Sequence, residues 1–445
     1  MARAAAARTL IVWLNGAPVA RWDIGRIHTL QYFPEWLESA QRRPLSLSLP
    51  FRPDNGAYQG DIVENYFDNL LPDSERIRRR IASHFRTEGI APHQLLAAVG
   101  RDCVGAIQLL PEGVEPTALF KIQGETMRDA DIARLLRATV SDDPMGLRYD
   151  EAELRLSIAG AQEKSALLWH EGAWQRPLAS TPTTHIFKLP LGRVGAMQAD
   201  MRTSLENEWL CSRVMAAFNL PVAQCQITQF DDVKTLVVER FDRRLAGDGS
   251  WIVRLPQEDF CQALGVSPQT KYQADGGPGI EDIMTVLAGS NEALTDRQNF
   301  FKTQLVFWLL AATDGHAKNF SIFHLPQSRF RATPLYDILS AHPIIGHGPN
   351  QLAPQRAKLA MAVRGRNAHY RMHDVQRRHW TAQAMHAGLG PAFAETLIEE
   401  VLREAPRVVD RVQVQLPNGF PADVADSILQ GLLHQAQHLN AMPPA

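Results

Sequence analysis

The sequence has few cysteines and no long apolar run. Its four cysteines are scattered over 445 residues without a CxxC pair: Cys103, Cys211, Cys225 and Cys261. This excludes a disulfide framework and a zinc site built on paired cysteines, and predicts core thiols of a cytoplasmic protein. No apolar run approaches the roughly 20 residues of a membrane helix, and the N-terminal segment has no signal-peptide core. We therefore expect no membrane partner.

The chain also lacks an excess of either charge, and it is poor in lysine. Its formal net charge is −2 at pH 7, which excludes binding of nucleic acid by the molecule as a whole but allows a local basic patch. Only eight of its 46 basic residues are lysines. Three of them, Lys164, Lys188 and Lys318, lie in the segments considered below, where a compact ammonium suits a phosphate as a point charge.

Hydrophobic periodicity and turn residues divide the chain into three regions: 1–112, 113–240 and 241–445. The first predicts a small α+β domain that ends at Pro111-Glu112-Gly113. The second predicts strands with one strong helix, and the third is mostly helical. The expected strands are 10–14, 45–49, 103–110, 154–158, 164–169, 184–189 and 236–241, and the expected helices before residue 256 are 75–85, 129–139 and 204–218.

The segment Thr313-Asp-Gly-His-Ala-Lys-Asn-Phe320 carries the strongest chemical signal. Asp314 and Asn319 are five residues apart, and Asp337 follows a stretch that predicts a hairpin. In phosphoryl-transfer enzymes an Asp and an Asn at this spacing, with a later Asp, serve as catalytic base and magnesium ligands. The apolar run 305–312 predicts a buried helix that delivers Asp314. The alternative is an ordinary polar loop, in which Asp, Gly and Asn are common.

An upstream half of such a site is also present. The turn 159–162 lies between two predicted strands, Lys188 lies on a strand with Lys164 as the alternative cation, and 239–241 follows a strand as a hinge would. Glu206 or Glu208 can pair with the cation, and we expect only one of them, preferably Glu208, to face inward. Each feature has a structural alternative, such as a surface lysine or a solvated glutamate. Their order along the chain is that of protein kinases.

These segments together resemble a known family. The chain carries Ser157-Ile-Ala-Gly-Ala-Gln-Glu-Lys164, His185-Ile-Phe-Lys-Leu-Pro190, Val238-Glu-Arg-Phe-Asp-Arg243, Arg254-Leu-Pro-Gln-Glu-Asp259, Ala312–Phe320 and Tyr336-Asp-Ile338, with Phe67–Ser74 and Gly276-Gly-Pro-Gly279. They are similar to the HipA family, the serine/threonine kinase toxins of bacterial toxin–antitoxin modules. The resemblance implies an α+β, protein-kinase-like two-lobed fold. It further implies an extra N-terminal α+β domain, a mostly helical C-terminal lobe, and ATP between the lobes.

The resemblance also implies roles for individual residues. Asp314 would be the catalytic base, and Asn319 and Asp337 would hold Mg2+. Ser157 would be the site of autophosphorylation, which inactivates the kinase because a phosphate there disrupts the adjacent loop; the alternative is an ordinary strand serine. The residues implied in ATP binding are Ala159, Gly160, Ala161, Gln162, Glu163, Lys164, Lys188, Glu239, Arg240, Phe241, His316, Ala317, Lys318, Asn319, Tyr336 and Asp337.

The resemblance implies partners as well: a HipB-type helix-turn-helix antitoxin, operator DNA bound through the toxin–antitoxin complex, and glutamate–tRNA ligase as the protein substrate. The densest basic stretch lies in the predicted helical region and could contact DNA phosphates; it consists of Arg364, Arg366, Arg371, Arg377, Arg378 and His379. The candidate contacts are Arg371, Arg377, Arg378 and His379. The alternative is a solvated helix face.

Two other functions fit part of the pattern. A small-molecule kinase would share the Asp-Asn-Asp motif but leaves residues 9–112 without a role. A catalytically silent co-repressor would have no physical need for Lys188, Asp314, Asn319 and Asp337 together. Magnesium-dependent ATP binding separates the silent protein from both enzymes, and the phosphate acceptor separates the enzymes from each other.

Overall fold

The computed structural model describes residues 8–140 and 162–444. The chain folds as two compact units, each made of segments that are distant in sequence. Unit 1 contains the chain up to Leu189 together with 228–269 and 321–330, and unit 2 contains 190–227, 270–320 and the chain from Arg331 onward. The predicted boundary near residue 112 therefore does not separate the two units.

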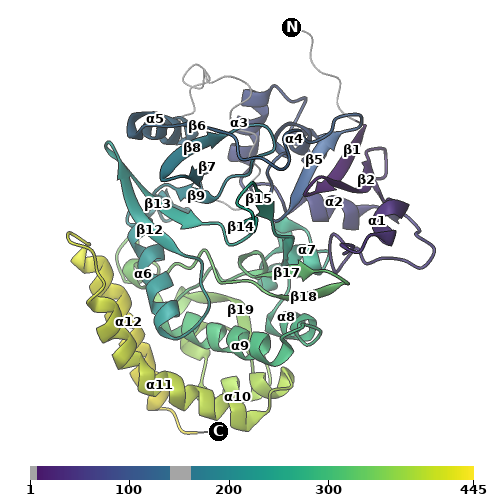
Figure 1. Cartoon of the computed structure of the whole chain (residues 1–445). Helices are drawn as coiled ribbons and strands as arrows, with labels where there is room; N and C mark the ends of the chain where they lie inside the picture. The colour runs from purple at the N-terminus through teal and green to yellow at the C-terminus, as the bar shows by residue number, and fades with distance from the viewer. Residues whose placement is uncertain (1–7, 141–161, 445) are drawn as a thin grey trace. The chain divides into compact units, whose positions relative to one another are not determined.

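An antiparallel sheet with four helices forms the N-terminal part of unit 1 (Figure 1), with strand order β4-β3-β2-β1-β5. Its core includes Trp22 stacked on Phe67, with 3.9 Å between ring centroids. Its elements are β1 (Thr9–Leu14), β2 (Ala17–Asp23), β3 (Thr29–Tyr32), α1 (Pro34–Glu38), β4 (Tyr58–Gln59), α2 (Asp61–Asp68), α3 (Glu75–Phe85), α4 (Pro92–Val99) and β5 (Ile107–Pro111).

The predictions for this part are confirmed except at residues 45–49 and at 103–106, where a loop precedes the strand that begins at Ile107. Helix α3 begins as expected, because the Ser74 side chain accepts a hydrogen bond from the Ile77 amide. Residues 45–49 form turns instead of a strand. Their backbone groups bond to side chains: the Leu45 amide donates to the Tyr32 hydroxyl (2.9 Å), and the Leu47 amide donates to Glu258 (2.8 Å). The alternation of Leu and Ser matches the period of a strand. Here, however, side chains accept the amide hydrogen bonds that a neighbouring strand would accept.

A second sheet of unit 1, in the order β12-β13-β9-β7-β8-β6, contains the upstream candidate residues. Helix α5 packs on it, as Ile132 and Leu136 share a core with Phe187. Its elements are β6 (Gly124–Thr126), α5 (Asp129–Val140), β7 (Lys164–His170), β8 (Ala173–Pro177), β9 (His185–Lys188), β12 (Cys225–Phe230) and β13 (Val233–Glu239). The strands predicted at 164–169, 184–189 and 236–241 are confirmed, whereas the one at 154–158 lies outside the described residues.

The remaining elements of unit 1 are short. The strands are β14 (Arg243–Leu245), β15 (Ile252–Arg254), β16 (Gln257–Asp259), β17 (Ser321–Leu325) and β18 (Arg329–Ala332), with helix α7 (Phe260–Ala263) after β16. Strand β17 pairs with both β16 and β18. The hairpin predicted between Asn319 and Asp337 is therefore confirmed.

Unit 2 is mostly helical, as predicted. Its elements are β10 (Gly192–Val194), β11 (Ala199–Met201), α6 (Ser204–Ala217), α8 (Ile280–Leu287), α9 (Ala293–Leu309), β19 (Lys358–Arg364), β20 (Ala368–Arg371), α10 (Arg377–His386), α11 (Pro391–Gln413) and α12 (Ala422–Asn440). The β19–β20 hairpin corrects the expectation of a helix through the basic stretch. Within residues 8–140 and 162–444, each helix is too short or too polar to cross a membrane.

Candidate active site

The loop that carries Asp314 begins at the end of a buried helix. Every residue of α9 from Thr303 to Leu309 is buried, and the chain leaves the helix through Ala311, whose φ is +50°. Asp314 is exposed, but its carbonyl oxygen accepts hydrogen bonds from the His316 amide and from the Asn319 side-chain nitrogen, both at 2.8 Å. The loop is therefore held largely through its backbone, and the Asp314 side chain remains exposed.

Asp337 lies on a second loop of unit 2 with an unusual backbone. Its φ is +60°, in the left-handed region, where a non-glycine residue costs on the order of 1 kcal/mol. The preceding Tyr336 hydroxyl donates to the Lys318 carbonyl at 2.9 Å. Beyond it, the Ser340 hydroxyl donates to the Leu310 carbonyl at 2.6 Å, which ties this loop to the end of α9. The structure thus brings the Asp337 loop onto the Asp314 loop.

The candidate magnesium ligands carry suitable donor atoms. Magnesium prefers oxygen ligands, including carboxylates and amide carbonyls. The Asn319 nitrogen is used by the Asp314 carbonyl, an orientation that leaves the amide oxygen for a cation. His316, Lys318 and Asn319 are all buried, which fixes the loop around these donors.

The two candidate lysines of unit 1 are cross-strand neighbours. Lys164 of β7 pairs directly with Lys188 of β9 in an antiparallel register, so their side chains leave the same face of the sheet. Lys188 is buried and Lys164 is half-buried. The sequence predicted them as alternatives, whereas this register allows both to contact one anionic ligand.

The described end of the predicted phosphate loop contacts the N-terminal part of unit 1. The Gln162 side chain donates to the Leu189 carbonyl, and Glu163 pairs with Arg80 and Arg76 of α3. Ser157, Ala159, Gly160 and Ala161 lie outside the described residues.

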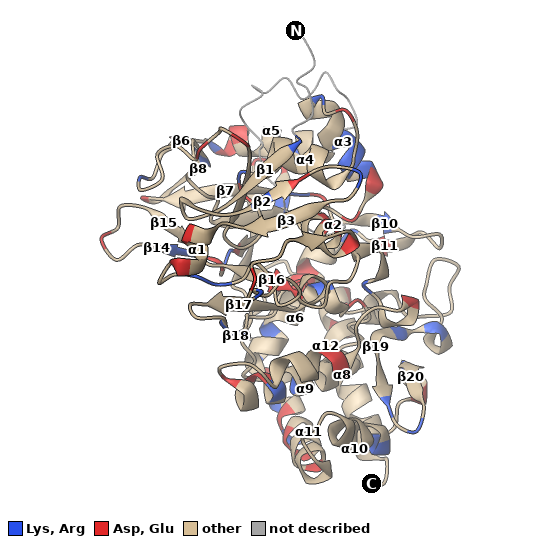
Figure 2. Cartoon of the chain, turned by 90° about the vertical axis from the view of Figure 1, so that its right-hand side faces the viewer, with Lys and Arg blue, Asp and Glu red and all other residues tan. Residues whose placement is uncertain are grey.

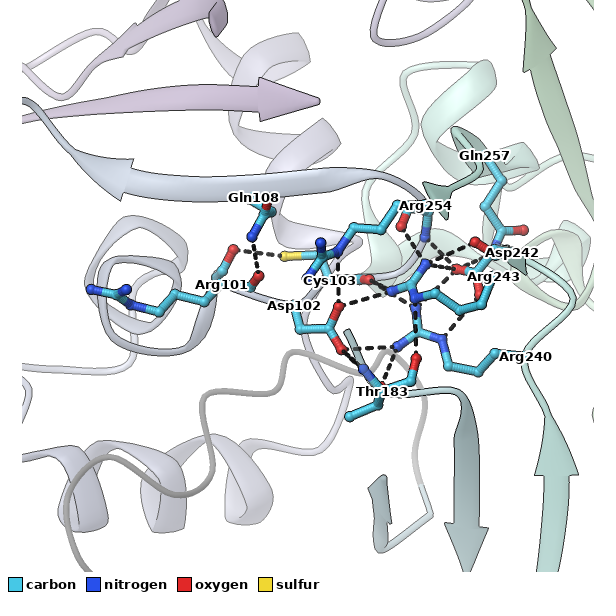
Figure 3. Close-up of polar contacts among 12 residues, drawn as sticks. Arg101, Asp102, Cys103, Gln108, Thr183, Arg240, Asp242, Arg243, Arg254 and Gln257 are labelled. Carbon is cyan, nitrogen blue, oxygen red and sulfur yellow. Dashed lines mark hydrogen bonds and ion pairs between the residues drawn. The ribbon is translucent and has the colours of Figure 1, made fainter. Parts of the chain in front are cut away.

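The predicted hinge, residues 239–241, runs into a buried group of charges (Figure 3). This arginine cluster consists of Asp102, Arg240, Asp242, Arg243 and Arg254, whose side chains are at most 9% exposed. Asp242 accepts from Arg240 at 2.9 Å, and Asp102 accepts from Arg243 at 2.9 Å and from Arg254 at 3.2 Å. The three arginines exceed the two aspartates, and the backbone carbonyls of Cys103, Gly105 and Thr183 accept further hydrogen bonds from Arg240 and Arg243.

The electrostatics of the arginine cluster keep its acids ionised. Burial would raise the pKa of Asp102, but Arg243, Arg240 and Arg254 hold it well below its usual value. Asp242 follows the same pattern, and its pKa is lowered by Arg240 and Arg243 against the effect of burial. Burial, together with Arg240, lowers the pKa of Arg243 to about 10. These acids are therefore structural, since their lone pairs are occupied by internal donors.

The contacts of the arginine cluster limit which groups of the predicted hinge could bind a nucleotide. The Arg240 side chain is committed to Asp242 and Asp102, and its amide donates to the Thr184 carbonyl at 2.9 Å. Glu239 remains exposed, and the Phe241 ring stands edge-on to Phe323 at 5.7 Å. An adenine contact by this segment stays a prediction, and the Arg240 side chain is excluded from it.

The two candidate glutamates on α6 differ from the expectation. Glu206 and Glu208 are 3% and 5% exposed, so both are buried. The prediction that only one faces inward is wrong, because α6 is buried from Ser204 to Cys211 on all sides. Which glutamate pairs with a lysine stays a prediction.

The candidate DNA-contacting residues fall into two groups. Lys and Arg follow the β19–β20 hairpin and α10 (Figure 2). Arg371 and Arg378 are exposed, but Arg377 is 3% exposed and pairs with Glu395 and Glu399 of α11. His379 is stacked on His369, with 3.8 Å between centroids. The structure therefore corrects the sequence prediction at Arg377 and His379, whose side chains make internal contacts.

One contact at the site was missed by the sequence prediction. The hydroxyl of Tyr272 donates a hydrogen bond to Oδ1 of Asp314. The signal that could have found it is Gly276-Gly-Pro-Gly279, a turn-forming segment just after this tyrosine.

Comparison with known proteins accounts for most of the chain. The HipA N-terminal domain family matches residues 10–110, and the HipA-like C-terminal domain family matches residues 156–409. The chain is 32% identical over 417 residues to the putative kinase Y4mE of Sinorhizobium fredii, covering 91% of this chain and 92% of that protein. It is 28% identical over 324 residues to the serine/threonine-protein kinase toxin HipA of Shewanella oneidensis, covering 70% and 69%.

A solved structure supports the fold. The Shewanella oneidensis HipA, in a complex with HipB and its operator DNA, superposes with a TM-score of 0.77 at 22% identity, covering 97% of this chain and 98% of that one. At this identity the likeness speaks for the fold alone. It confirms the α+β, kinase-like fold class predicted from the sequence.

Proposed function

Because this chain belongs to the HipA family of kinases, we propose that it is an ATP-dependent serine/threonine protein kinase toxin of a toxin–antitoxin module. The observation that carries the proposal is the pair of loops around Asp314 and Asp337. One presents an exposed carboxylate from a backbone-anchored turn, and the other holds an acid in a strained left-handed conformation. The two loops are joined by the hydrogen bond from the Tyr336 hydroxyl to the Lys318 carbonyl, and this supports a shared role for the two acids.

The proposed mechanism assigns a role to each described group. Asp314 accepts the proton of the acceptor hydroxyl as that oxygen attacks the γ-phosphorus of ATP, and the bond from this phosphorus to the bridging oxygen breaks to release ADP. Lys188, with Lys164 beside it, binds phosphate oxygens. Asn319 and Asp337 hold Mg2+, which neutralises the charge of the phosphates when it is bound. Glu239 and Phe241 contribute to the adenine site.

The further assignments rest on the relatives and on the family resemblance. A HipB-type antitoxin and operator DNA are the proposed partners, since the Shewanella structure is a complex of HipA with both. Glutamate–tRNA ligase is the proposed substrate, and Ser157 is the proposed site of autophosphorylation. Arg371 and Arg378 are the exposed candidates for DNA phosphates.

The proposal is tested with Asp314→Asn and, as a matched control, Asp410→Asn on the exposed face of α11. Each purified protein is incubated with labelled ATP, Mg2+ and glutamate–tRNA ligase with its tRNA, and phosphosites are mapped by mass spectrometry. We expect Asp314→Asn to lose about 10²–10⁴-fold in transfer rate and the control to match wild type. An active Asp314→Asn enzyme refutes the base assignment, and a wild type that phosphorylates only Ser157 keeps the kinase but not the substrate.

A further inference from the structure

The segment from Thr270 to Gly279 is folded back on itself by its glycines. Gly276 has a φ of +92°, and the Gly277 amide donates to the Tyr272 carbonyl at 2.9 Å. A Cβ atom on Gly277 would lie 1.9 Å from the Thr270 carbonyl oxygen, so glycine is required there for close approach. The turn therefore fixes the position of Tyr272 relative to the rest of the segment.

The folded segment lies against the Asp314 loop, and both belong to unit 2. The Tyr272 hydroxyl donates to Oδ1 of Asp314, and its ring stands edge-on to His316 with 5.0 Å between centroids. The Ala317 amide donates to the Lys271 carbonyl at 3.4 Å. Two consecutive residues of the segment thus contact three residues of the loop.

Gln273, the residue after the tyrosine, is anchored as well. The Gln273 side chain accepts a hydrogen bond from the Ala362 amide of β19 at 2.7 Å. It also lies directly over Gly279, where a Cβ atom would be 2.3 Å from its amide nitrogen. Tyr272 is half-buried while Asp314 is exposed. The Tyr272 hydroxyl is therefore a donor in a fixed position, and it restrains the exposed carboxylate of Asp314.

We propose that Tyr272 is a positioning residue for phosphoryl transfer: its hydroxyl holds Oδ1 of Asp314, so that Oδ2 faces the acceptor hydroxyl. The inference rests on the proposed role of Asp314 as the base. A base must lie within about 2.6–3.2 Å of the proton that it removes, and a misplacement of about 1 Å can cost on the order of 100-fold in rate. The glycine turn, the Gln273 anchor and the Tyr272 hydroxyl together form the support of the base.

The test is Tyr272→Phe, which removes one oxygen atom and keeps the ring against His316. We expect the single-turnover transfer rate to fall by about 10- to 100-fold, with Mg-ATP affinity and thermal unfolding unchanged. Tyr370→Phe, on β20 of the same unit, is the matched control and should behave as wild type. If the ring merely packs, Tyr272→Phe keeps the wild-type rate. If the hydroxyl instead blocks the acceptor, the rate rises. Either result overturns the proposal.

A double-mutant cycle separates this inference from the function on which it rests. In the Asp314→Asn background, Tyr272→Phe should have no further effect on the residual rate, because the group that it positions is gone. Independent, multiplicative losses would refute the positioning role. An Asp314→Asn protein with normal activity would refute the base assignment itself, whatever Tyr272→Phe does.

Discussion

Asp102 and Asp242 are buried among three arginines, whereas Asp314 is exposed on a loop that is held mainly through its backbone. In the arginine cluster, the carboxylates themselves receive the arginine and amide donors. In the Asp314 loop, the fixed donors meet the carbonyl, and Tyr272 meets one carboxylate oxygen. The difference separates acids that stabilise the fold from the acid that we propose as the catalytic base.

The largest expected effect on stability comes from Asp102→Asn. It removes one of two negative charges that balance three buried arginines, and such a loss typically lowers the free energy of unfolding by about 3–5 kcal/mol. Asp131→Asn is the matched control, because Asp131 pairs with Arg128 and Arg134 at the surface, where ion pairs contribute little. Urea unfolding of both variants measures the difference. Equal midpoints would remove the distinction between buried and exposed acids.

The next effect concerns Asp337, the proposed magnesium ligand, whose backbone is left-handed. Asp337→Gly should lower magnesium-dependent ATP affinity by about 10- to 100-fold, because a ligand is lost. The unfolding free energy should stay the same or rise by up to about 1 kcal/mol, since glycine adopts the left-handed conformation without strain. Calorimetry with and without Mg2+, and thermal unfolding, give the two values. Unchanged affinity would mean that Asp337 does not bind the metal.

Low pH should reduce the stabilising contribution of the arginine cluster in the wild-type protein. The pKa values of Asp102 and Asp242 are lowered in the folded state, so their stabilising contribution is complete above the unfolded value of about 3.9. It is lost as the pH falls further toward the folded values, because the unfolded state then binds more protons. Urea unfolding below about pH 4 should show a steeper loss in wild type than in Asp102→Asn. Parallel curves would contradict this.

The smallest expected effect separates the two kinds of basic residue near β20. Arg371→Ala should leave stability unchanged and reduce the salt dependence of operator binding by about one unit of slope, assayed with a HipB-type antitoxin. Arg377→Ala should instead lower stability, because it leaves Glu395 and Glu399 without their arginine. If Arg377→Ala instead changed the salt dependence of operator binding and left stability unchanged, Arg377 would be a DNA-contacting residue.

Local elements and the Asp-Asn-Asp motif could be predicted from the sequence. Helix α3 follows from Ser74 and the pattern after it, the β17–β18 hairpin from the turn between Asn319 and Asp337, and the class of chemistry from the spacing of Asp314, Asn319 and Asp337. These depend on residues a few positions apart, so propensity, capping and periodicity suffice to predict them.

The partners of individual side chains could not be predicted from the sequence, because they depend on how the chain folds. Arg240 meets Asp102 across 138 positions, and Tyr272 meets Asp314 across 42. Residues 45–49 do not form the expected strand, because the side chains of Tyr32 and Glu258 accept hydrogen bonds from their amides. In each case a charged or polar group interacts with a partner that is distant in sequence and comes close only on folding. Local sequence patterns therefore do not predict these contacts.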